Sequence, residues 1–138
     1  MVGVIVTTPM GRKTRLFIRT IAGGLDADET IRFLKDLKRH LKGRKLLLIW
    51  DGLPAHRAKR VQAWLDDNSS WLRTERIPAY APEVNPIEYC WGAMKKKHLG
   101  NLRADGMPAL GRALKRAKRA MNDSELLGGF LRASGLYD

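Results

Sequence analysis

The longest apolar stretch in this chain is the five-residue run from Leu46 to Trp50, which Asp51 and Gly52 end abruptly. Five residues are the length of a strand and fall far short of the roughly 18 that a membrane span requires. An unbroken apolar run, with no polar residue at alternate positions, is typical of a strand that is covered on both faces. Such strands lie in the middle of sheets flanked by helices, so the run predicts an α/β fold.

The segments around this run alternate between strand and helix patterns. Residues 2–8 and 16–21 are strand-like and flank a turn at residues 9–13, which predicts an opening β-hairpin. A helix follows with Asp26 as N-cap, Glu29 at the capping-box spacing and Gly43 at the C′ position. Beyond residue 50 the predicted elements are a helix at 57–67, a strand at 71–77, and helices at 85–99, 108–121 and 124–133. This order predicts a mixed sheet with flanking helices, in one domain over residues 1–138 whose last part, from about residue 101 to 138, is a helical extension.

The charge of the chain is the first indication of a partner. Among 138 residues, 26 Lys and Arg stand against 14 Asp and Glu, so the net charge is +12. Such an excess attracts polyanions, of which nucleic acid is the commonest, and a basic surface that contacts only solvent is the alternative. Apolar residues at 44% and charged residues at 29% exclude a disordered tail and a membrane protein. One cysteine, Cys90, allows neither an internal disulfide nor a cysteine-rich zinc site, and the simple interpretation is a reducing, intracellular compartment.

Two acidic residues occupy positions that suit catalysis. Asp51 ends the apolar strand, and functional groups of α/β sheets gather beyond the carboxyl ends of strands, although an Asp-Gly pair is also an ordinary turn. Glu88 lies 37 residues later, in the first turn of a helix that Asn85 caps and Pro86 begins. Glu88 is either a metal-binding carboxylate at the same sheet edge or a capping residue that reaches back to the N–H of Asn85. His56, five residues after Asp51, is interpreted as a group that orients this site, and a structural hydrogen-bonding role is the alternative.

The sequence around these acids resembles a known family. Residues 46–56 and 77–91, the latter with the pattern Y-x-P-E-x-N-P-I-E-x-x-W, resemble the DDE catalytic domain of bacterial insertion-sequence transposases of the mariner-like superfamily. The resemblance extends over residues 2 to 100 and implies a ribonuclease-H-like fold. It further implies cleavage and transfer of DNA strands at transposon ends, with two Mg²⁺ (or Mn²⁺) ions held by three carboxylates. The second carboxylate falls on Asp51 and the third on Glu88, with His56 and Asn85 as orienting residues.

The sequence also departs from the pattern of this family. The family's first Asp ends a strand that precedes the hairpin, whereas this sequence opens with the hairpin, and Asp26, Asp28 and Glu29 look like capping residues. We therefore expect the first strand and the first carboxylate to be missing. The chain then corresponds to the C-terminal part of a transposase catalytic domain that is inactive alone and holds at most one weakly bound ion. The alternative is a non-enzymatic remnant or regulator that binds DNA or a transposase.

Basic residues dominate the region after Glu88, with nine Lys or Arg against one acid between residues 95 and 119. Three of them follow Glu88 on its helix and four share one face of the next helix: Lys95, Lys96, Lys97, Arg112, Lys115, Arg116 and Arg119. We predict that they contact phosphates of double-stranded DNA without base specificity, and a solvated amphipathic helix is the alternative. The expected setting is the nucleoid-associated cytoplasm, with no membrane. The expected protein partners are a full-length transposase or a second copy that pairs sheet edges.

Overall fold

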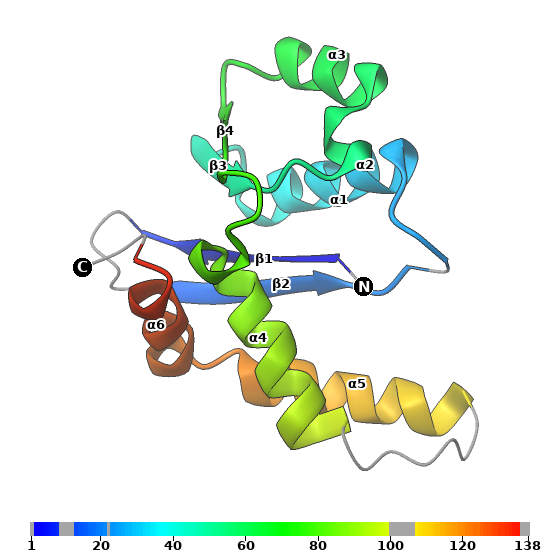
Figure 1. Ribbon diagram of the computed structural model, residues 1–138. Coiled ribbons are helices and arrows are strands. Elements are labelled where there is room, and N and C mark those ends of the chain that lie inside the picture. Colours follow the sequence, from blue (N-terminus) through cyan, green and yellow to red (C-terminus); the bar gives the residue numbers. More distant parts are fainter. Residues whose placement is uncertain (1, 9–12, 22, 100–106, 136–138) are drawn as a thin grey trace. The chain divides into compact units, whose positions relative to one another are not determined.

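A computed structural model of the chain describes residues 2–8, 13–21, 23–99 and 107–135, with the backbone alone for residues 98, 99 and 107–110 (Figure 1). The described residues form two compact units. Unit 1 contains those of Arg19–Ala81 together with Val2, and unit 2 contains those of Gly3–Ile18 and Pro82–Asp138. The order of helices and strands is the predicted one, except that an additional short helix follows the strand at Leu46–Trp50.

Unit 1 is built around two parallel strands. Its elements are α1 (Ala27–His40), β3 (Leu46–Trp50), α2 (Pro54–Arg57), α3 (Lys59–Asp67) and β4 (Leu72–Arg76). β3 and β4 pair in the register that sets Leu46 opposite Leu72 and Trp50 opposite Arg76. The buried side chains come from both strands and from the apolar faces of α1 and α3: Phe33, Leu34, Leu37, Leu48, Val61, Leu65 and Leu72.

The apolar run of β3 is not covered on both faces, so this part of the prediction is wrong. Leu48 is buried, whereas Leu47 is 53% exposed and Ile49 is 41% exposed. Successive side chains of a strand point to opposite faces, so the face that carries Leu47 and Ile49 is the less covered one. β3 pairs with β4 alone among the described strands, and the hairpin forms a separate two-stranded sheet.

The two ends of α1 show how local chemistry sets a helix. Asp26 is the N-cap, as predicted, and its Oδ1 accepts the N–H of Glu29 at 2.8 Å. At the other end the N–H of Lys42 donates to Arg39 O and the N–H of Gly43 donates to Lys38 O, which is the Schellman pattern. The C′ residue is therefore Lys42, at φ 52°, and Gly43 follows it at φ 70°. The prediction of Gly43 at C′ is off by one position, because the helix ends one residue earlier than its apolar pattern suggests.

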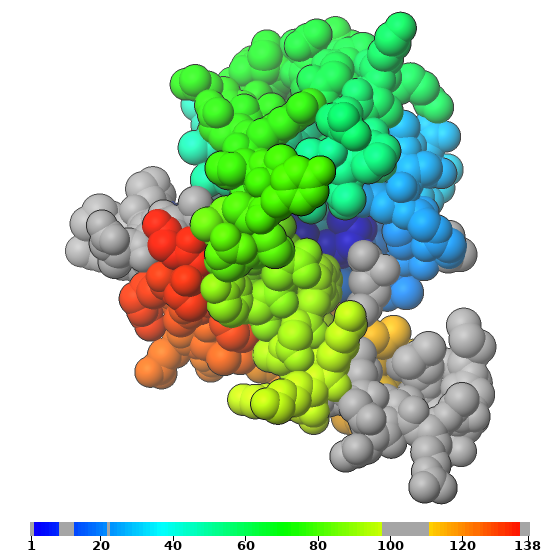
Figure 2. All heavy atoms as spheres, viewed as in Figure 1, coloured from blue at the N-terminus to red at the C-terminus, as the bar shows by residue number. Residues whose placement is uncertain are grey.

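Unit 2 combines the hairpin with the C-terminal helices. Its elements are β1 (Val2–Thr7), β2 (Thr14–Arg19), the 3₁₀ turn η1 (Pro82–Val84), α4 (Pro86–Met94), the π-helical turn η2 (Lys95–Leu99), α5 (Met107–Met121) and α6 (Ser124–Ala133), where Val2 and Arg19 count with unit 1. The yellow-green end of α4 and η2 lies on the surface seen in Figure 2. One core joins the hairpin to three helices through Leu16, Cys90, Met94, Ala117, Met121 and Leu127.

Cys90 belongs to this core. It is fully buried, and burial raises the pKa of its thiol to about 11. The thiol therefore stays protonated and unreactive at neutral pH. Among the described residues, no helix is both long and apolar enough to cross a bilayer.

Candidate active site

Asp51 lies directly after β3, at the edge of unit 1 where both parallel strands end. Its carboxylate is 38% exposed. Oδ1 accepts the N–H of Leu53 at 3.2 Å, the geometry of an Asx turn, and also lies 2.9 Å from Nδ1 of His56. Among the described residues Oδ2 has no such contact, so one oxygen of the carboxylate is held and the other is available.

His56, on the short helix α2, lies against Asp51, and its orienting role stays a prediction. Its Nδ1 lies 2.9 Å from Oδ1 and 3.1 Å from the backbone oxygen of Asp51. Both neighbours are acceptors, so Nδ1 carries the proton and donates. The ring stacks on Trp50 with centroids 4.2 Å apart and planes 12° apart, and only 11% of the side chain is exposed. The position of the imidazole is therefore set by stacking as well as by hydrogen bonding.

The stack of Trp50 and His56 is a part of the site that the sequence analysis missed. Trp50 and His56 are six residues apart and belong to different elements, so no strand or helix periodicity links them. The available signal was that they flank Asp51 on both sides along the chain.

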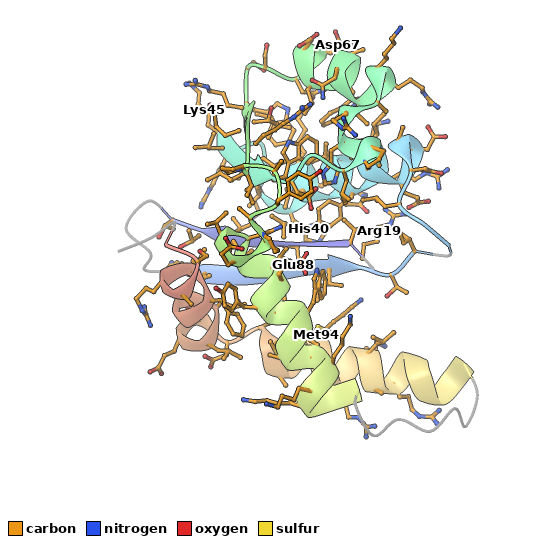
Figure 3. The ribbon with its side chains drawn as sticks, in the orientation of Figure 1. Arg19, His40, Lys45, Asp67, Glu88 and Met94 are labelled. Atoms are coloured by element: carbon orange, nitrogen blue, oxygen red, sulfur yellow. The ribbon has the colours of Figure 1, made fainter. Side chains whose placement is uncertain are left out.

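Glu88 lies in the first turn of α4, in unit 2 (Figure 3). Its side chain is exposed and, within the described residues, makes no hydrogen bond or ion pair. Asn85 is the N-cap by position, but its side chain makes no capping bond, and its N–H donates to Pro82 O at 3.0 Å. The N–H that a capping-box glutamate would accept is thus already bonded. The interpretation of Glu88 as a capping residue is wrong, and its carboxylate remains available.

Asp51 and Glu88 belong to separate units, and each is described within its own. Carboxylate oxygens are the ligands that Mg²⁺ and Mn²⁺ prefer, and both residues offer an oxygen without a hydrogen-bond partner. The donor chemistry therefore fits a divalent ion. Among the described residues, no group of three or more His, Cys, Asp or Glu could hold a metal ion.

The predicted basic surface is present in unit 2. Lys95, Lys96 and Lys97 are exposed on η2. On α5 the four predicted cations are exposed: Arg112, Lys115, Arg116 and Arg119. Ala113, Ala117 and Met121 are buried on the opposite face, whereas the side chain of Leu110, also predicted there, lies outside the described part. The amphipathic pattern of α5 is confirmed, and its contact with DNA stays a prediction.

Residues 3–110 match the family model described as DDE superfamily endonuclease. The chain belongs to this family. The predicted resemblance is thereby confirmed at the level of the superfamily. No curated protein matches the chain.

The fold of the chain is similar to solved structures of the Mos1 mariner transposase catalytic domain. The structure with Raltegravir and Mn matches at TM-score 0.66 and 18% identity, over 94% of this chain and 74% of that one. The structure with Raltegravir and Mg matches at 0.63 and 18%, over 88% and 64%. A third crystal structure of the domain matches at 0.62 and 17%, over 94% and 72%. At these identities the likeness concerns the fold, and it confirms the ribonuclease-H-like α/β class.

Proposed function

We propose that this protein is part of a DDE transposase catalytic domain that acts in metal-dependent cleavage and transfer of DNA strands. The observation that supports this most directly is Asp51 at the C-terminal edge of β3, with one carboxylate oxygen held by His56 and the other available. The family match extends over both Asp51 and Glu88. A non-enzymatic remnant is the less favoured function, because Oδ2 of Asp51 and the carboxylate of Glu88 have no partner among the described residues, whereas a purely structural role would occupy them.

In this proposal Asp51 and Glu88 are catalytic carboxylates and metal ligands. A Mg²⁺ or Mn²⁺ ion bound there supplies a Lewis acid that stabilises negative charge on the reacting phosphate. Asp51 presents its Oδ2, because Oδ1 is occupied by Leu53 and His56. Glu88 presents a carboxylate from the first helical turn of α4, where the helix dipole favours negative charge.

Calorimetric titration of the chain with Mn²⁺ tests these roles. We expect one weak site that Asp51→Asn removes. We also expect that the isolated chain does not nick supercoiled plasmid with Mg²⁺ or Mn²⁺, because two carboxylates are fewer than the three that the family resemblance implies. Nicking that disappears in both Asp51→Asn and Glu88→Gln would contradict this expectation and point to a further acid in the site.

His56 and Asn85 are proposed as orienting residues. The donor at Nδ1 of His56 fixes the Asp51 carboxylate, and Asn85 occupies the N-cap position of the helix that carries Glu88. Loss of a residue that orients a metal ligand weakens metal binding by about 10- to 100-fold. We expect this loss in His56→Leu and near-normal Mn²⁺ affinity in His56→Asn, whose amide can donate from the position of Nδ1. Equal affinities for both variants would remove His56 from the site.

Double-stranded DNA is the proposed partner of the basic surface, in the nucleoid-associated cytoplasm. Neutralising Lys95, Lys96 and Lys97 together should weaken binding to any duplex and reduce the slope of log affinity against log salt by up to about three, roughly one for each lysine that contacts a phosphate. A control matched for the change in charge neutralises three exposed lysines of unit 1, Lys35, Lys45 and Lys59. An unchanged affinity and slope in the triple variant would exclude this surface.

A second copy of the chain is the proposed protein partner. The edge of β3 away from β4 has no paired strand in the described part of the chain, and Leu47 and Ile49 expose apolar area on the same strand. Strand edges of this kind pair with other chains. Sedimentation at micromolar concentration should show a dimer that Ile49→Lys weakens, and a monomer for the unsubstituted chain would contradict the proposal.

A further inference from the structure

The edge of unit 1 that carries Asp51 also carries the loop that follows β4. Because β3 and β4 are parallel, both strands end there, and the N–H of Ile77 donates to Trp50 O at 2.8 Å to close the ladder. The chain continues from this point into two loops. One contains Asp51 and Leu53, and the other contains Tyr80.

Tyr80 has two unfavourable features at once. Its side chain is fully exposed, at 102% of its reference area, and makes no hydrogen bond within the described residues. Its backbone is left-handed, at φ 60°, a conformation that residues other than glycine seldom adopt. A strained backbone that carries a solvated aromatic ring is a feature of ligand-contacting loops. Contacts with a bound ligand offset the free-energy cost of the strain and of the exposed ring. Pro78 and Pro82 on either side restrict the loop further.

Other exposed residues that follow or end the two strands point to a nucleic-acid ligand. Leu53 is 46% exposed beside Asp51, and Arg57 on α2 and Arg76 at the end of β4 are exposed cations. An aromatic ring stacks on the face of any nucleobase, and arginines pair with the phosphates on either side of it. Inside a duplex the faces of the bases are covered by their neighbours, so only an unpaired or terminal base is open to the ring.

We propose that this edge binds an unpaired nucleotide of the DNA, with Tyr80 stacked on its base and Arg57 and Arg76 on its phosphates. The proposal rests on the proposed function, since it takes DNA as the substrate, and it adds a contact that distinguishes unpaired from paired strands. A protein partner would also cover an exposed tyrosine. The two arginines and the net charge of +12 favour a polyanion.

Fluorescence anisotropy with a labelled 12-nucleotide single strand, and with a relaxed closed-circular duplex that has no terminal bases as unlabelled competitor, tests the proposal. Tyr80→Ala should weaken binding of the single strand by about 5- to 150-fold, the usual effect of losing one stacked base, and should leave duplex binding within about twofold. Tyr80→Phe keeps the ring and should bind both like the unsubstituted chain. Ser70→Ala, which changes an exposed side chain just before β4 and so at the other end of that strand, is the control and should change neither.

A second measurement separates binding from folding. Tyr80→Gly relieves the left-handed backbone and should melt at the same or a higher temperature than the unsubstituted chain, while it loses single-strand affinity as Tyr80→Ala does. An unchanged single-strand affinity in both variants, or an equal loss for single strand and duplex, would overturn the proposal and leave the proposed function standing. Failure of the unsubstituted chain to bind either DNA would overturn both.

Discussion

The two sheets of this protein differ in whether other residues cover their outer strand edges and faces. In unit 2 the edge of β2 is occupied: the N–H of Leu16 donates to Oδ1 of Asn122 at 3.0 Å, and the N–H of Thr14 donates to Oγ of Ser124 at 3.2 Å. In unit 1 no described residue does the same for the free edge of β3, and Leu47 and Ile49 of that strand are exposed. Both sheets have two strands, so the difference lies in the later segments of the chain that pack against them.

The covered edge of β2 contributes to stability, whereas the open edge of β3 is compatible with the proposed pairing with a second copy. Side chains that occupy a strand edge prevent other chains from pairing with it. For β2 these side chains are Asn122, between α5 and α6, and Ser124, the first residue of α6. The uncovered strand β3 is the one that leads into Asp51. Uncovered apolar area and backbone groups lower the stability of a chain of this size, and the proposed pairing with a second copy would cover them.

The largest expected effect is in the core of unit 2. Leu127 is fully buried there, and Leu127→Ala should lower the free energy of unfolding by about 2–5 kcal/mol through lost burial and a cavity. Leu47→Ala in β3 is the matched change at an exposed site and should stay within about 0.5 kcal/mol. Urea unfolding followed by circular dichroism measures both, and equal losses would end the distinction between the two sheets.

A smaller effect is expected where the edge of β2 is covered. Asn122→Ala removes the acceptor for the N–H of Leu16 and should destabilise the protein by about 1–3 kcal/mol. Asn122→Asp keeps an oxygen at that position and should restore most of the loss. Light scattering on the same samples should show more self-association for the alanine variant, because an open edge then exists in unit 2 as well. An alanine variant that is as stable and as monodisperse as the aspartate variant would contradict the role of Asn122.

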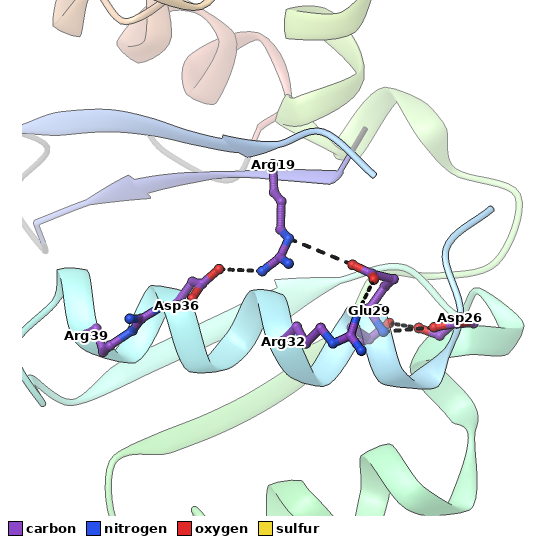
Figure 4. Close-up of polar contacts among 7 residues, drawn as sticks. Arg19, Asp26, Glu29, Arg32, Asp36 and Arg39 are labelled. Carbon is purple, nitrogen blue, oxygen red and sulfur yellow. Dashed lines mark hydrogen bonds and ion pairs between the residues drawn. The ribbon is translucent and has the colours of Figure 1, made fainter. Parts of the chain in front are cut away.

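The next effect concerns the ion pairs of α1 in unit 1 (Figure 4). Partial burial raises the pKa of Asp36, but the hydrogen bonds and charges of Arg39 and Arg19 outweigh it, and the pKa lies below its ordinary value of 3.8. A carboxyl with a lowered pKa in the folded state stabilises the protein above its unfolded pKa, and this contribution is lost as the pH falls through the folded pKa. We expect the free energy of unfolding to decrease when the pH is lowered below about 4. Asp36 accounts for about 0.2–1 kcal/mol of this decrease, because its ion pairs are partly solvated.

Urea titrations between pH 3 and pH 6 measure this contribution. Asp36→Asn should be less stable than the unsubstituted chain at pH 6, and the difference should be smaller at pH 3. A difference between the two chains that is the same at both pH values would exclude ionised Asp36 as the cause.

The smallest expected effect is at the end of α1. Lys42 occupies the left-handed C′ position. Lys42→Gly should raise the free energy of unfolding by roughly a few tenths of a kcal/mol. Glycine relieves the backbone strain of the folded state, but it also raises the conformational entropy of the unfolded chain, which offsets part of the gain. Gly43→Ala, one residue later and also left-handed, should destabilise by about 1 kcal/mol. A stabilising Gly43→Ala would show that the Schellman geometry is not maintained in solution.

Local patterns in the sequence determined the elements and the family of this protein. The hairpin, the N-cap at Asp26, the strand that ends at Asp51 and the amphipathic face of α5 each depend on residues within a few positions of one another, and the structure has all of them. The motif around Glu88 was equally local and sufficed for the superfamily. Such features follow from the sequence because turns, caps and helix faces are set by short-range hydrogen bonds and by the periodicity of side chains.

Only the tertiary structure decided what these elements contact. It separated the hairpin from the parallel pair and exposed Leu47 and Ile49, although the same apolar run suits a strand buried on both faces. It also stacked His56 on Trp50 and turned the N–H of Asn85 toward Pro82, which left Glu88 without its capping bond. An apolar side chain or a free carboxylate is compatible with several neighbours, and which of them it meets depends on packing between segments far apart in the chain.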